Sequence, residues 1–484
     1  MIPLDFYNHI ISLLGSDLVL SSPAELSVYE SDGLTGYHQI PGLVVFPLET
    51  SQVSQVVKAC SDFGIPFVAR GAGTGLSGGA LPSPDGVLIV LSKMRKILEI
   101  DPINQRMVVE PGVTNIEISK AVSKYNLYYA PDPSSQIVCT IGGNVAENSG
   151  GAHCLKYGFT THHVLGLEVV FPDGSIEQIG SSTLDFPGYD LRGAIIGSEG
   201  TLGIVTKIVV KLTRIPESVA TLVADFESPE QAGEAVTGII GAGIIPAAVE
   251  MLDSLAIQAC EAATHSGFSL DAGAVLIVEV DGPDAETKFT FEQVKNICKQ
   301  ALATNIKVAE TSAQRAAIWA GRKSAFAAVG RISPSYYVQD GVIPRTALGS
   351  VLAKIAKMSL ESGIRVANVF HAGDGNLHPL VLYNPSIEFE AQKAEKLASD
   401  IVALCVEAGG SITGEHGVGV DKACSMPKMF SEQDIEIMLS FKSAFDPQGI
   451  CNPDKIFPTP RLCGESPGPY KAHPLEKAGI AERF

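Results

Sequence analysis

The sequence predicts an α+β fold in two parts, and three observations lead to this prediction. Before about residue 216, short apolar strands flank loops that are rich in glycine. After that point, apolar strands alternate with long amphipathic helices. Hydrophobic residues make up 45% of the 484 residues and charged residues only 18%, which is typical of a well-buried globular protein.

The first half contains helices and short strands that caps and turns delimit. The segment from Thr50 to Phe63 has apolar residues on one face and is predicted to be a helix. Thr114 and Glu117 have the spacing of a capping box, which opens a second helix that reaches Tyr125. Strands are predicted at 65–69, 87–91, 106–110, 165–171, 176–179 and 204–212.

The second half is built from longer elements. Ser228 followed by Pro229 is typical of a helix start. Strands are predicted over 274–280, 336–343 and 365–370, and helices over 284–303, 313–329, 344–362, 387–408 and 431–444. The predicted domain ranges are an N-terminal segment 1–37, a first domain 38–216, a second domain 217–458 and an extended C-terminal tail 459–484.

The stretch from Arg70 to Ala80 holds five glycines in eleven residues. Glycine tolerates positive φ and lets the backbone approach a ligand closely, so this loop indicates a cradle for phosphates. Gly73, Gly75 and Gly78 match a dinucleotide-binding motif, but two prolines and a glycine follow where that motif needs a helix. We therefore predict that the loop binds a diphosphate through amides alone; a surface linker is the alternative.

Two further glycine-rich loops, 140–151 and 197–203, belong to the same half, and Pro131–Ser135 precedes them. Ordering several such loops costs conformational entropy, which a small domain does not need to spend on folding. Together they favour one large, flat ligand that carries phosphate, with Thr140, Ser149 and Ser198 as hydroxyl donors. Three independent surface turns are the alternative.

Two short histidine segments in the second half indicate chemistry. His371 and His378 lie in one glycine-flanked segment, and Glu415 and His416 lie in another. Imidazole and carboxylate side chains in such loops suit a transition metal with open positions, and His416 suits a general base near neutral pH. Structural histidines are the alternative. Arg322 either grips a carboxylate with its two-pronged guanidinium or is structural.

Charge and cysteine usage exclude other classes. The net charge of −18 and the lack of a basic run argue against nucleic acid and against an anionic membrane surface. We expect no signal peptide, and glycines and a proline interrupt the most apolar stretch, 235–249. The nine cysteines form no CxxC pair, which argues against a usual iron–sulfur motif, and we expect free thiols in the cytoplasm.

These motifs together resemble the vanillyl-alcohol oxidase/PCMH superfamily. The three glycine loops and Pro131–Ser135 are similar to its FAD-binding domain, and 371–379, 414–419 and 445–453 to the C-terminal domain of its 2-hydroxyacid branch. The resemblance runs from about Ser22 to Pro458. It implies a PCMH-type FAD-binding domain of two subdomains over 38–216 and a ferredoxin-like α+β substrate and metal domain over 217–458.

The resemblance also implies roles for individual residues. Those implied to hold noncovalent FAD are Arg70, Gly71, Gly73, Thr74, Gly75, Leu76, Ser77, Pro131, Asp132, Thr140, Gly143, Ser149, Ile204 and Asn452. His371, His378 and Glu415 would bind a divalent metal, zinc or manganese. His416 would take the hydroxyl proton and Arg322 would hold the substrate carboxylate. Some superfamily members attach FAD covalently through a histidine, and His153 lies in the corresponding loop, but this branch generally binds FAD noncovalently.

The activity that the resemblance implies is hydride transfer from a small D-2-hydroxy acid to flavin N5. Residues 319–323, 331–334 and 482–484 are similar to the glycolate-oxidising subunits of the branch. No basic residue follows Tyr336 and Tyr337, as relatives acting on dicarboxylates have, so glycolate is expected ahead of D-lactate. The implied partners are iron–sulfur and FAD-domain subunits with a quinone acceptor, at the inner face of the membrane, and no nucleic acid.

Two alternatives belong to other classes of protein. A flavin-binding scaffold subunit would resemble the first half but lack the metal ligands and the base, whereas His371, His378, Glu415 and His416 are all present. A nicotinamide-dependent dehydrogenase would need a helix after Gly78, which the prolines disfavour.

Overall fold

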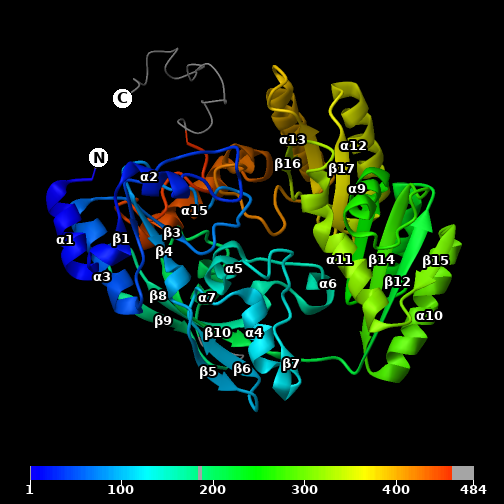
Figure 1. The fold of residues 1–484 in the computed structure, drawn as a ribbon, viewed down its shortest axis with the longest axis horizontal. Helices are drawn as coiled ribbons and strands as arrows, with labels where there is room; N and C mark the ends of the chain where they lie inside the picture. Colours follow the sequence, from blue (N-terminus) through cyan, green and yellow to red (C-terminus); the bar gives the residue numbers. More distant parts are fainter. Residues whose placement is uncertain (1, 184–187, 460–484) are drawn as a thin grey trace. The chain divides into compact units, whose positions relative to one another are not determined.

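The computed structural model describes residues 2–183 and 188–459 (Figure 1). The chain divides into two compact units. The first contains the residues up to Ser149, Phe159–Arg214 and the residues from Glu415 onward, and the second contains Gly150–Gly158 and Ile215–Gly414. The units thus differ from the predicted ranges 38–216 and 217–458 by two exchanged segments, 150–158 and the part after Gly414, and those ranges stay predictions.

The first unit contains two larger sheets and a two-stranded one of β7 (Leu127–Tyr128) and β11 (Thr213–Arg214), and one of the larger sheets is mainly parallel. Its strands lie in the order β1 (Val19–Leu20), β2 (Leu43–Val45), β4 (Val87–Val90) and β3 (Phe67–Arg70), and β4 pairs in parallel with both β2 and β3. Helix α3 (Thr50–Phe63) has the predicted bounds. Its buried face, with Val53, Val56 and Val57, joins the core formed by these strands, as the apolar periodicity of the sequence requires.

The other larger sheet of the first unit is antiparallel. Its strands follow the order β5 (Ile97–Asp101), β6 (Arg106–Val109), β10 (Ile204–Lys211), β8 (Val164–Val170) and β9 (Ile176–Gly180). Helix α4 (Asn115–Val122) starts at the predicted capping box, where the backbone N–H of Thr114 donates to Glu117 Oε2 at 3.0 Å. The strands predicted in this half all lie within two residues of observed ones.

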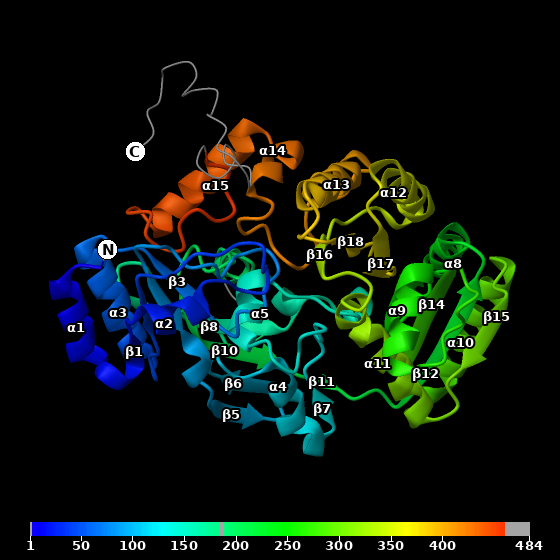
Figure 2. The same cartoon turned by 45° about the horizontal axis from the view of Figure 1, so that its top comes forward.

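The second unit is built on one antiparallel sheet of seven strands (Figure 2). Their order is β15 (Asn305–Val308), β12 (Ser218–Phe226), β14 (Ala274–Gly282), β13 (Ala248–Asp253), β17 (Val366–His371), β18 (Pro379–Tyr383) and β16 (Ser335–Val338). One hydrophobic cluster joins this sheet to four helices, which are α8 (Pro229–Gly241), α10 (Asp284–Gln300), α12 (Leu348–Ser362) and α13 (Glu390–Glu407).

Alternate residues of the central strands point away from that cluster. On β13, Val249 and Met251 belong to the cluster and Glu250 between them does not. On β14, Glu279 likewise lies between the clustered Leu276, Val278 and Val280. Because side chains alternate across a sheet, Glu250 and Glu279 face the other side, where both bond to α11 (Ser312–Val329). Helix α9 (Ser254–Thr264) packs against α11, β13 and β17.

Some elements differ from the predictions. The predicted strand 336–343 ends at Val338, because the buried Asp340 bonds to Thr413 and Gly414 instead of continuing a ladder. The prediction missed several elements. Among them are the strands β2, β5, β12 and β15, the helices α1 (Leu4–Leu14) and α9, and β13, whose apolar run a glutamate interrupts. The predicted extended tail lies, apart from residue 459, outside the described residues, as do residues 482–484.

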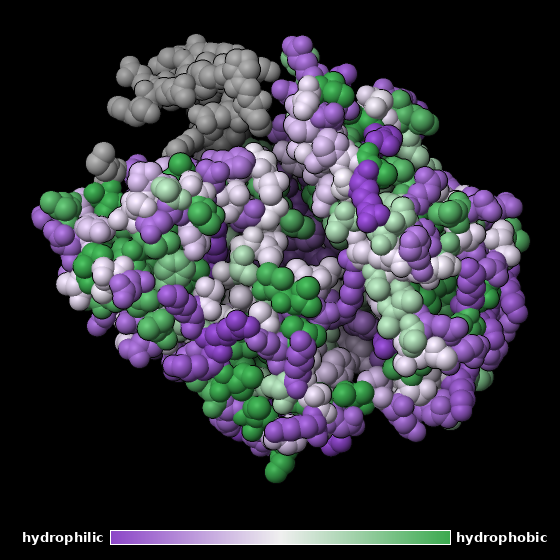
Figure 3. Space-filling model, in the orientation of Figure 1, coloured by the Kyte–Doolittle hydropathy of each residue, from purple (hydrophilic) through white to green (hydrophobic). Residues whose placement is uncertain are grey.

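Seven cysteines are free thiols, as predicted, and all of them are buried. Cys424 is disulfide-bonded, so the prediction of a free thiol is wrong for that residue. Among residues 2–183 and 188–459, no helix has both the length and the apolar character needed to cross a membrane. Figure 3 shows hydrophilic side chains over much of the visible face, with apolar residues interspersed among them.

Asp253 gives the second unit a pH-dependent stability. Its Oδ1 accepts the N–H of Ala256 at the start of α9, and its Oδ2 accepts two donors of Asn368, at 2.8 and 2.9 Å. Burial nevertheless raises the pKa of Asp253 to about 6. Between pH of about 4 and 6 the native state therefore binds more protons than the unfolded chain, so this residue contributes less stability as pH rises.

We predict that the advantage of the wild type over Asp253→Asn in unfolding free energy falls as pH rises from 4 to 7. The expected fall is up to about 3 kcal/mol, because each pKa unit is worth about 1.4 kcal/mol. Urea unfolding of both proteins across this pH range measures the difference, and the comparison cancels the titration of all other groups. A difference that does not change with pH contradicts the prediction.

Candidate active site

The glycine-rich loop 71–86 connects the parallel strands β3 and β4 and contains no helix, which confirms the rejection of the dinucleotide-binding motif. Gly73 and Gly78 have φ of +68° and +78°, which side chains disfavour. A Cβ on Gly75 would meet only Glu147 Oε1, at 4.0 Å, so the space beside Gly75 is open. This backbone can approach a ligand, as an FAD diphosphate requires.

The structure brings the predicted flavin residues of the three loops together. Gly71 lies so close to Thr140 that a Cβ added to Gly71 would be 2.2 Å from Thr140 Oγ1. Asn452, which is 2% exposed, donates from Nδ2 to Gly79 O at 2.9 Å and to Glu199 O at 2.6 Å. A Cβ on Gly200 would meet only Asn452 Nδ2, at 4.0 Å, so a second open space lies there. The fit of these cradles to FAD is therefore good.

The remaining predicted flavin residues take different positions in the same unit. Thr140 caps helix α5 (Ile141–Glu147) and accepts a hydrogen bond from the N–H of Gly143 at 3.4 Å. The carbonyl of Pro131 accepts Asn115 Nδ2 at 3.0 Å. Ile204 is 2% exposed, its side chain belongs to the hydrophobic core, and its backbone pairs with Val170 of β8. Its role toward FAD stays a prediction.

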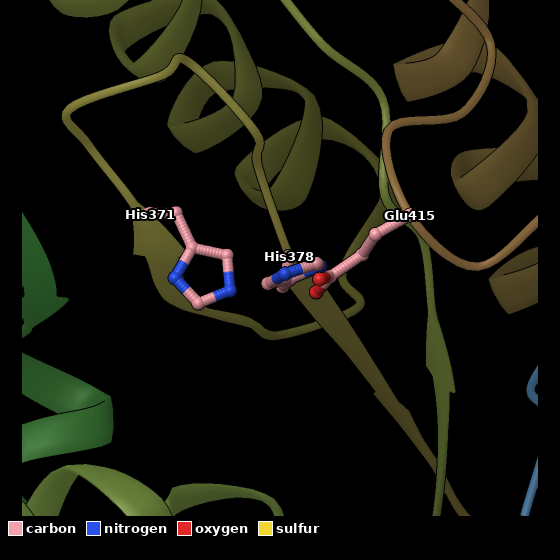
Figure 4. Close-up of side chains that lie close together, drawn as sticks. All are labelled: His371, His378 and Glu415. Atoms are coloured by element: carbon pink, nitrogen blue, oxygen red, sulfur yellow. The ribbon is translucent and has the colours of Figure 1, made fainter. Parts of the chain in front are cut away.

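The three predicted metal ligands lie close together (Figure 4). His371 ends β17, His378 directly precedes β18, and Glu415 follows Gly414 on a loop. One ligand atom of each lies within 4.8 Å of those of the other two. The imidazole rings are 5.1 Å apart at 87° to each other. Since metal–ligand bonds measure about 2.0–2.2 Å, small side-chain rotations bring these atoms around one ion, and two nitrogens with a carboxylate suit zinc or manganese.

A buried glutamate that the sequence analysis missed lies behind this cluster. Glu250 is 0% exposed. Its Oε1 is 2.7 Å from His371 Nδ1, and its Oε2 accepts Arg322 Nε at 2.7 Å. Burial by itself raises the pKa of Glu250, but the contacts with His371 and Arg322 outweigh burial and hold the pKa below its usual value. The available signal was a lone glutamate within the apolar run 248–252.

Arg322 is buried as well, with 2% of its surface exposed. Its Nε and Nη2 both lie 2.7 Å from Glu250 Oε2. Nε donates a hydrogen bond to this oxygen, whereas the buried Nη2 has no hydrogen-bond partner in the part of the chain that the structure describes. Nη2 is therefore available to the substrate carboxylate that the sequence analysis assigned to this residue, and that role stays a prediction.

Buried carboxylates fix the loop on both sides of Glu415 and His416. On the N-terminal side, Asp340 Oδ2 accepts Thr413 Oγ1 and the N–H of Gly414, both at 3.0 Å. On the C-terminal side, Glu199 accepts the N–H groups of Val418 and Gly419, both at 2.7 Å. His416 Nε2 lies 3.9 Å from Glu415 Oε1. The predicted base and metal ligand therefore occupy the short span between two anchored segments.

His153 does not have the surroundings of a reactive residue. Its Nε2 lies 3.3 Å from Glu279 Oε1, and its ring packs on Trp319 at 5.5 Å. The same segment is tied to the second unit by Tyr157, whose hydroxyl donates to Asp281 at 2.7 Å. His153 therefore has a structural role in the segment 150–158, and noncovalent FAD binding stays a prediction.

Comparison with known proteins identifies the family. Residues 41–180 match the FAD binding domain, and residues 215–456 match the C-terminal domain of FAD linked oxidases. The chain belongs to the FAD-linked oxidase family. It is therefore an FAD-dependent oxidoreductase, as the resemblance implied.

Individual relatives support this assignment over almost the whole chain. The protein is 50% identical over 447 residues to glycolate oxidase subunit GlcD of Escherichia coli (strain K12), covering 92% of this chain and 90% of that relative. It is 33% identical over 425 residues to D-lactate dehydrogenase of Anaerostipes hadrus, covering 86% and 89%. The solved structure of p-cresol methylhydroxylase has a TM-score of 0.80 at 17% identity, covering 94% and 97%, and confirms the PCMH-type fold.

Replacing the loop anchor Glu199 tests how this FAD-linked oxidase holds its loop. In Glu199→Gln the amide NH₂ faces one of the two backbone donors, which loses its acceptor inside the protein. We expect the free energy of unfolding to fall by about 1–3 kcal/mol. Urea unfolding followed by flavin fluorescence reports on this unit. The control is Glu177→Gln, at an exposed position of β9, which we expect to stay within about 0.5 kcal/mol of the wild type. Equal stability of the two variants contradicts the anchoring role.

Proposed function

We propose that the protein oxidises a small D-2-hydroxy acid, glycolate to glyoxylate, with D-lactate to pyruvate as the alternative. The observation that carries the proposal is the cluster of His371, His378 and Glu415 with the adjacent His416 in an FAD-linked oxidase. The relatives named glycolate oxidase subunit and D-lactate dehydrogenase support the substrate class. The higher identity to the former, 50% against 33%, favours glycolate.

We assign a role in this reaction to each bound group and to each side chain. Bound FAD supplies the hydride acceptor, and a divalent cation supplies the positive charge that makes a hydroxyl more acidic. His371, His378 and Glu415 hold the cation. His416 accepts the hydroxyl proton, while the substrate loses the hydrogen on its α-carbon as hydride. Arg322 orients the substrate through its carboxylate, so that one face of the α-carbon is presented for hydride loss.

The surroundings of the tyrosine pair support a monocarboxylate substrate. Tyr336 and Tyr337 belong to β16, which ends at Val338 and is the last strand in the order of the sheet. The next two residues, Gln339 and Asp340, are 5% and 0% exposed, and Asp340 already bonds to Thr413 and Gly414. A second substrate carboxylate would find no cation on this segment, so a substrate with one carboxylate is favoured.

We also propose that electrons pass on to partner subunits. The relative in Escherichia coli is named a subunit, which supports a complex of several chains. The proposed partners are iron–sulfur and FAD-domain chains with a quinone as the final acceptor, as the resemblance of the sequence implies. In such a complex the chain would lie in the cytoplasm, held at the inner face of the membrane through its partners. We expect slow peroxide formation by the isolated chain in air, whereas rapid peroxide formation would make the protein an oxidase that uses oxygen directly.

Anaerobic mixing of the flavin-loaded protein with glycolate or D-lactate tests the proposed reaction. We expect the visible flavin absorbance to bleach with both and faster with glycolate. Faster bleaching with D-lactate would make D-lactate the preferred substrate and leave the proposed mechanism unchanged. Bleaching by neither acid, in a preparation shown to contain zinc or manganese, would overturn the substrate class. Reduction by added nicotinamide cofactor would support the dehydrogenase alternative.

His416→Ala tests the proposed base. General-base catalysis by a positioned side chain contributes about 10²- to 10⁴-fold, so the rate of flavin reduction by glycolate should fall by that factor. The flavin content should stay unchanged, because His416 is not among the residues of the FAD cradle. His9→Ala, at an exposed position of α1, is the matched control. An unchanged reduction rate in His416→Ala removes this residue from the proton transfer.

A further inference from the structure

Glu250 is a carboxylate at a buried position of β13, and its presence there requires a physical explanation. Its two strand neighbours, Val249 and Met251, belong to the hydrophobic cluster, and Glu250 itself is 0% exposed. An ionised carboxylate is costly to bury unless donors surround it, and replacing such a pair by apolar side chains is often neutral or stabilising. Stability therefore gives no sufficient reason for a glutamate at this position.

The sheet register places Glu250 directly against a predicted metal ligand. In the ladder between β13 and β17, Glu250 pairs with His371. Glu250 Oε1 lies 2.7 Å from His371 Nδ1. An ionised carboxylate can only accept, so Nδ1 carries the proton. A neutral imidazole has one N–H, and the lone pair is then on Nε2, which is the atom left to bind a cation.

The other oxygen of Glu250 fixes the predicted substrate-binding arginine. Arg322 Nε and Nη2 both lie 2.7 Å from Oε2. The guanidinium is planar and rigid, so two contacts on one edge determine the direction of the opposite edge. One buried carboxylate thus sets the tautomer of a metal ligand with one oxygen and the orientation of an arginine with the other.

We propose that Glu250 is the positioning residue of this active site, which holds His371 as a metal ligand through Nε2 and aligns Arg322 for the substrate carboxylate. The inference rests on the proposed function, since it assigns the cation and the substrate carboxylate to these two side chains. It adds a residue that contacts neither the cation nor the substrate carboxylate. The single side chain of this residue couples the metal site to the substrate site.

The chain offers a matched control on the neighbouring strand. Glu279 of β14 is 1% exposed and faces the same side of the sheet. It accepts Arg315 Nε and Trp319 Nε1, both at 2.8 Å. Its histidine neighbour is His153 and not a predicted metal ligand. Glu250 and Glu279 therefore share burial, sheet and pairing with an arginine of α11, and differ in the contact with His371.

The test compares zinc binding by the flavin-loaded wild type, Glu250→Gln and Glu279→Gln. A glutamine keeps the volume of the side chain, but its NH₂ group faces either His371 or Arg322. If it faces His371, the imidazole proton moves to Nε2 and blocks the metal. Loss of such a carboxylate partner typically weakens metal affinity about 10- to 100-fold. We expect that loss for Glu250→Gln in a competition titration with a chromogenic chelator, and at most about a twofold change for Glu279→Gln.

Steady-state kinetics at saturating zinc tests the second half of the inference. With the metal site filled, a misaligned Arg322 should raise KM for glycolate in Glu250→Gln more than it lowers kcat, since the lost contact acts on substrate binding. An equal zinc affinity in Glu250→Gln and the wild type overturns the inference, and so does an equal loss in both glutamine variants.

A measurement on the unmutated protein keeps the inference testable if Glu250→Gln does not fold. At pH 8, ¹⁵N NMR of the metal-free protein labelled at histidine distinguishes the two tautomers, and loss of a signal in His371→Asn assigns the residue. We expect the Nδ1–H form for His371, and the Nε2–H form would overturn the inference. Failure of the wild type to bind zinc would contradict the proposed metal site alone, because the tautomer is measured without metal.

Discussion

A carboxyl group removed from water must be met by hydrogen-bond donors, and three such groups hold the candidate site of this protein in place. Glu250 meets His371 and Arg322, Asp340 meets Thr413 and Gly414, and Glu199 meets two backbone N–H groups beyond His416. Each is at most 5% exposed. Because a buried carboxyl group cannot exchange its partner for water, each of these contacts resists rearrangement of the segment that it holds.

The proposed flavin loops differ from this arrangement, because the donors that they would offer are backbone N–H groups. Gly75 and Gly200 adjoin space that no side chain fills, and Gly73 and Gly78 adopt backbone conformations that favour glycine. The protein carries a net charge of −18, yet the proposed cofactor and substrate are both anions. Binding would therefore rely on local donors, which are amides in the proposed flavin loops and Arg322 at the proposed substrate site, because the overall field repels these ligands.

Much of the fold was predictable because the signals are local. The apolar face of Thr50–Phe63, the capping box at Thr114 and the prolines after Gly78 each act within a few residues, and the structure confirms all three. The motif histidines and Glu415 were found because glycines flank them. The strand β13 was missed because Glu250 interrupts its apolar pattern. The same residue contacts His371 of the candidate site.

The sequence alone determined the family, the flavin loops, the candidate ligands and most of the elements, since composition, caps and periodicity are properties of neighbouring residues. Only the tertiary structure decided which donors meet which buried carboxylates. Glu250 and His371 are 121 residues apart, and Glu199 and Val418 are 219 apart. Such pairs form through sheet register and the return of the chain to the first unit after Gly414, which no short-range pattern encodes.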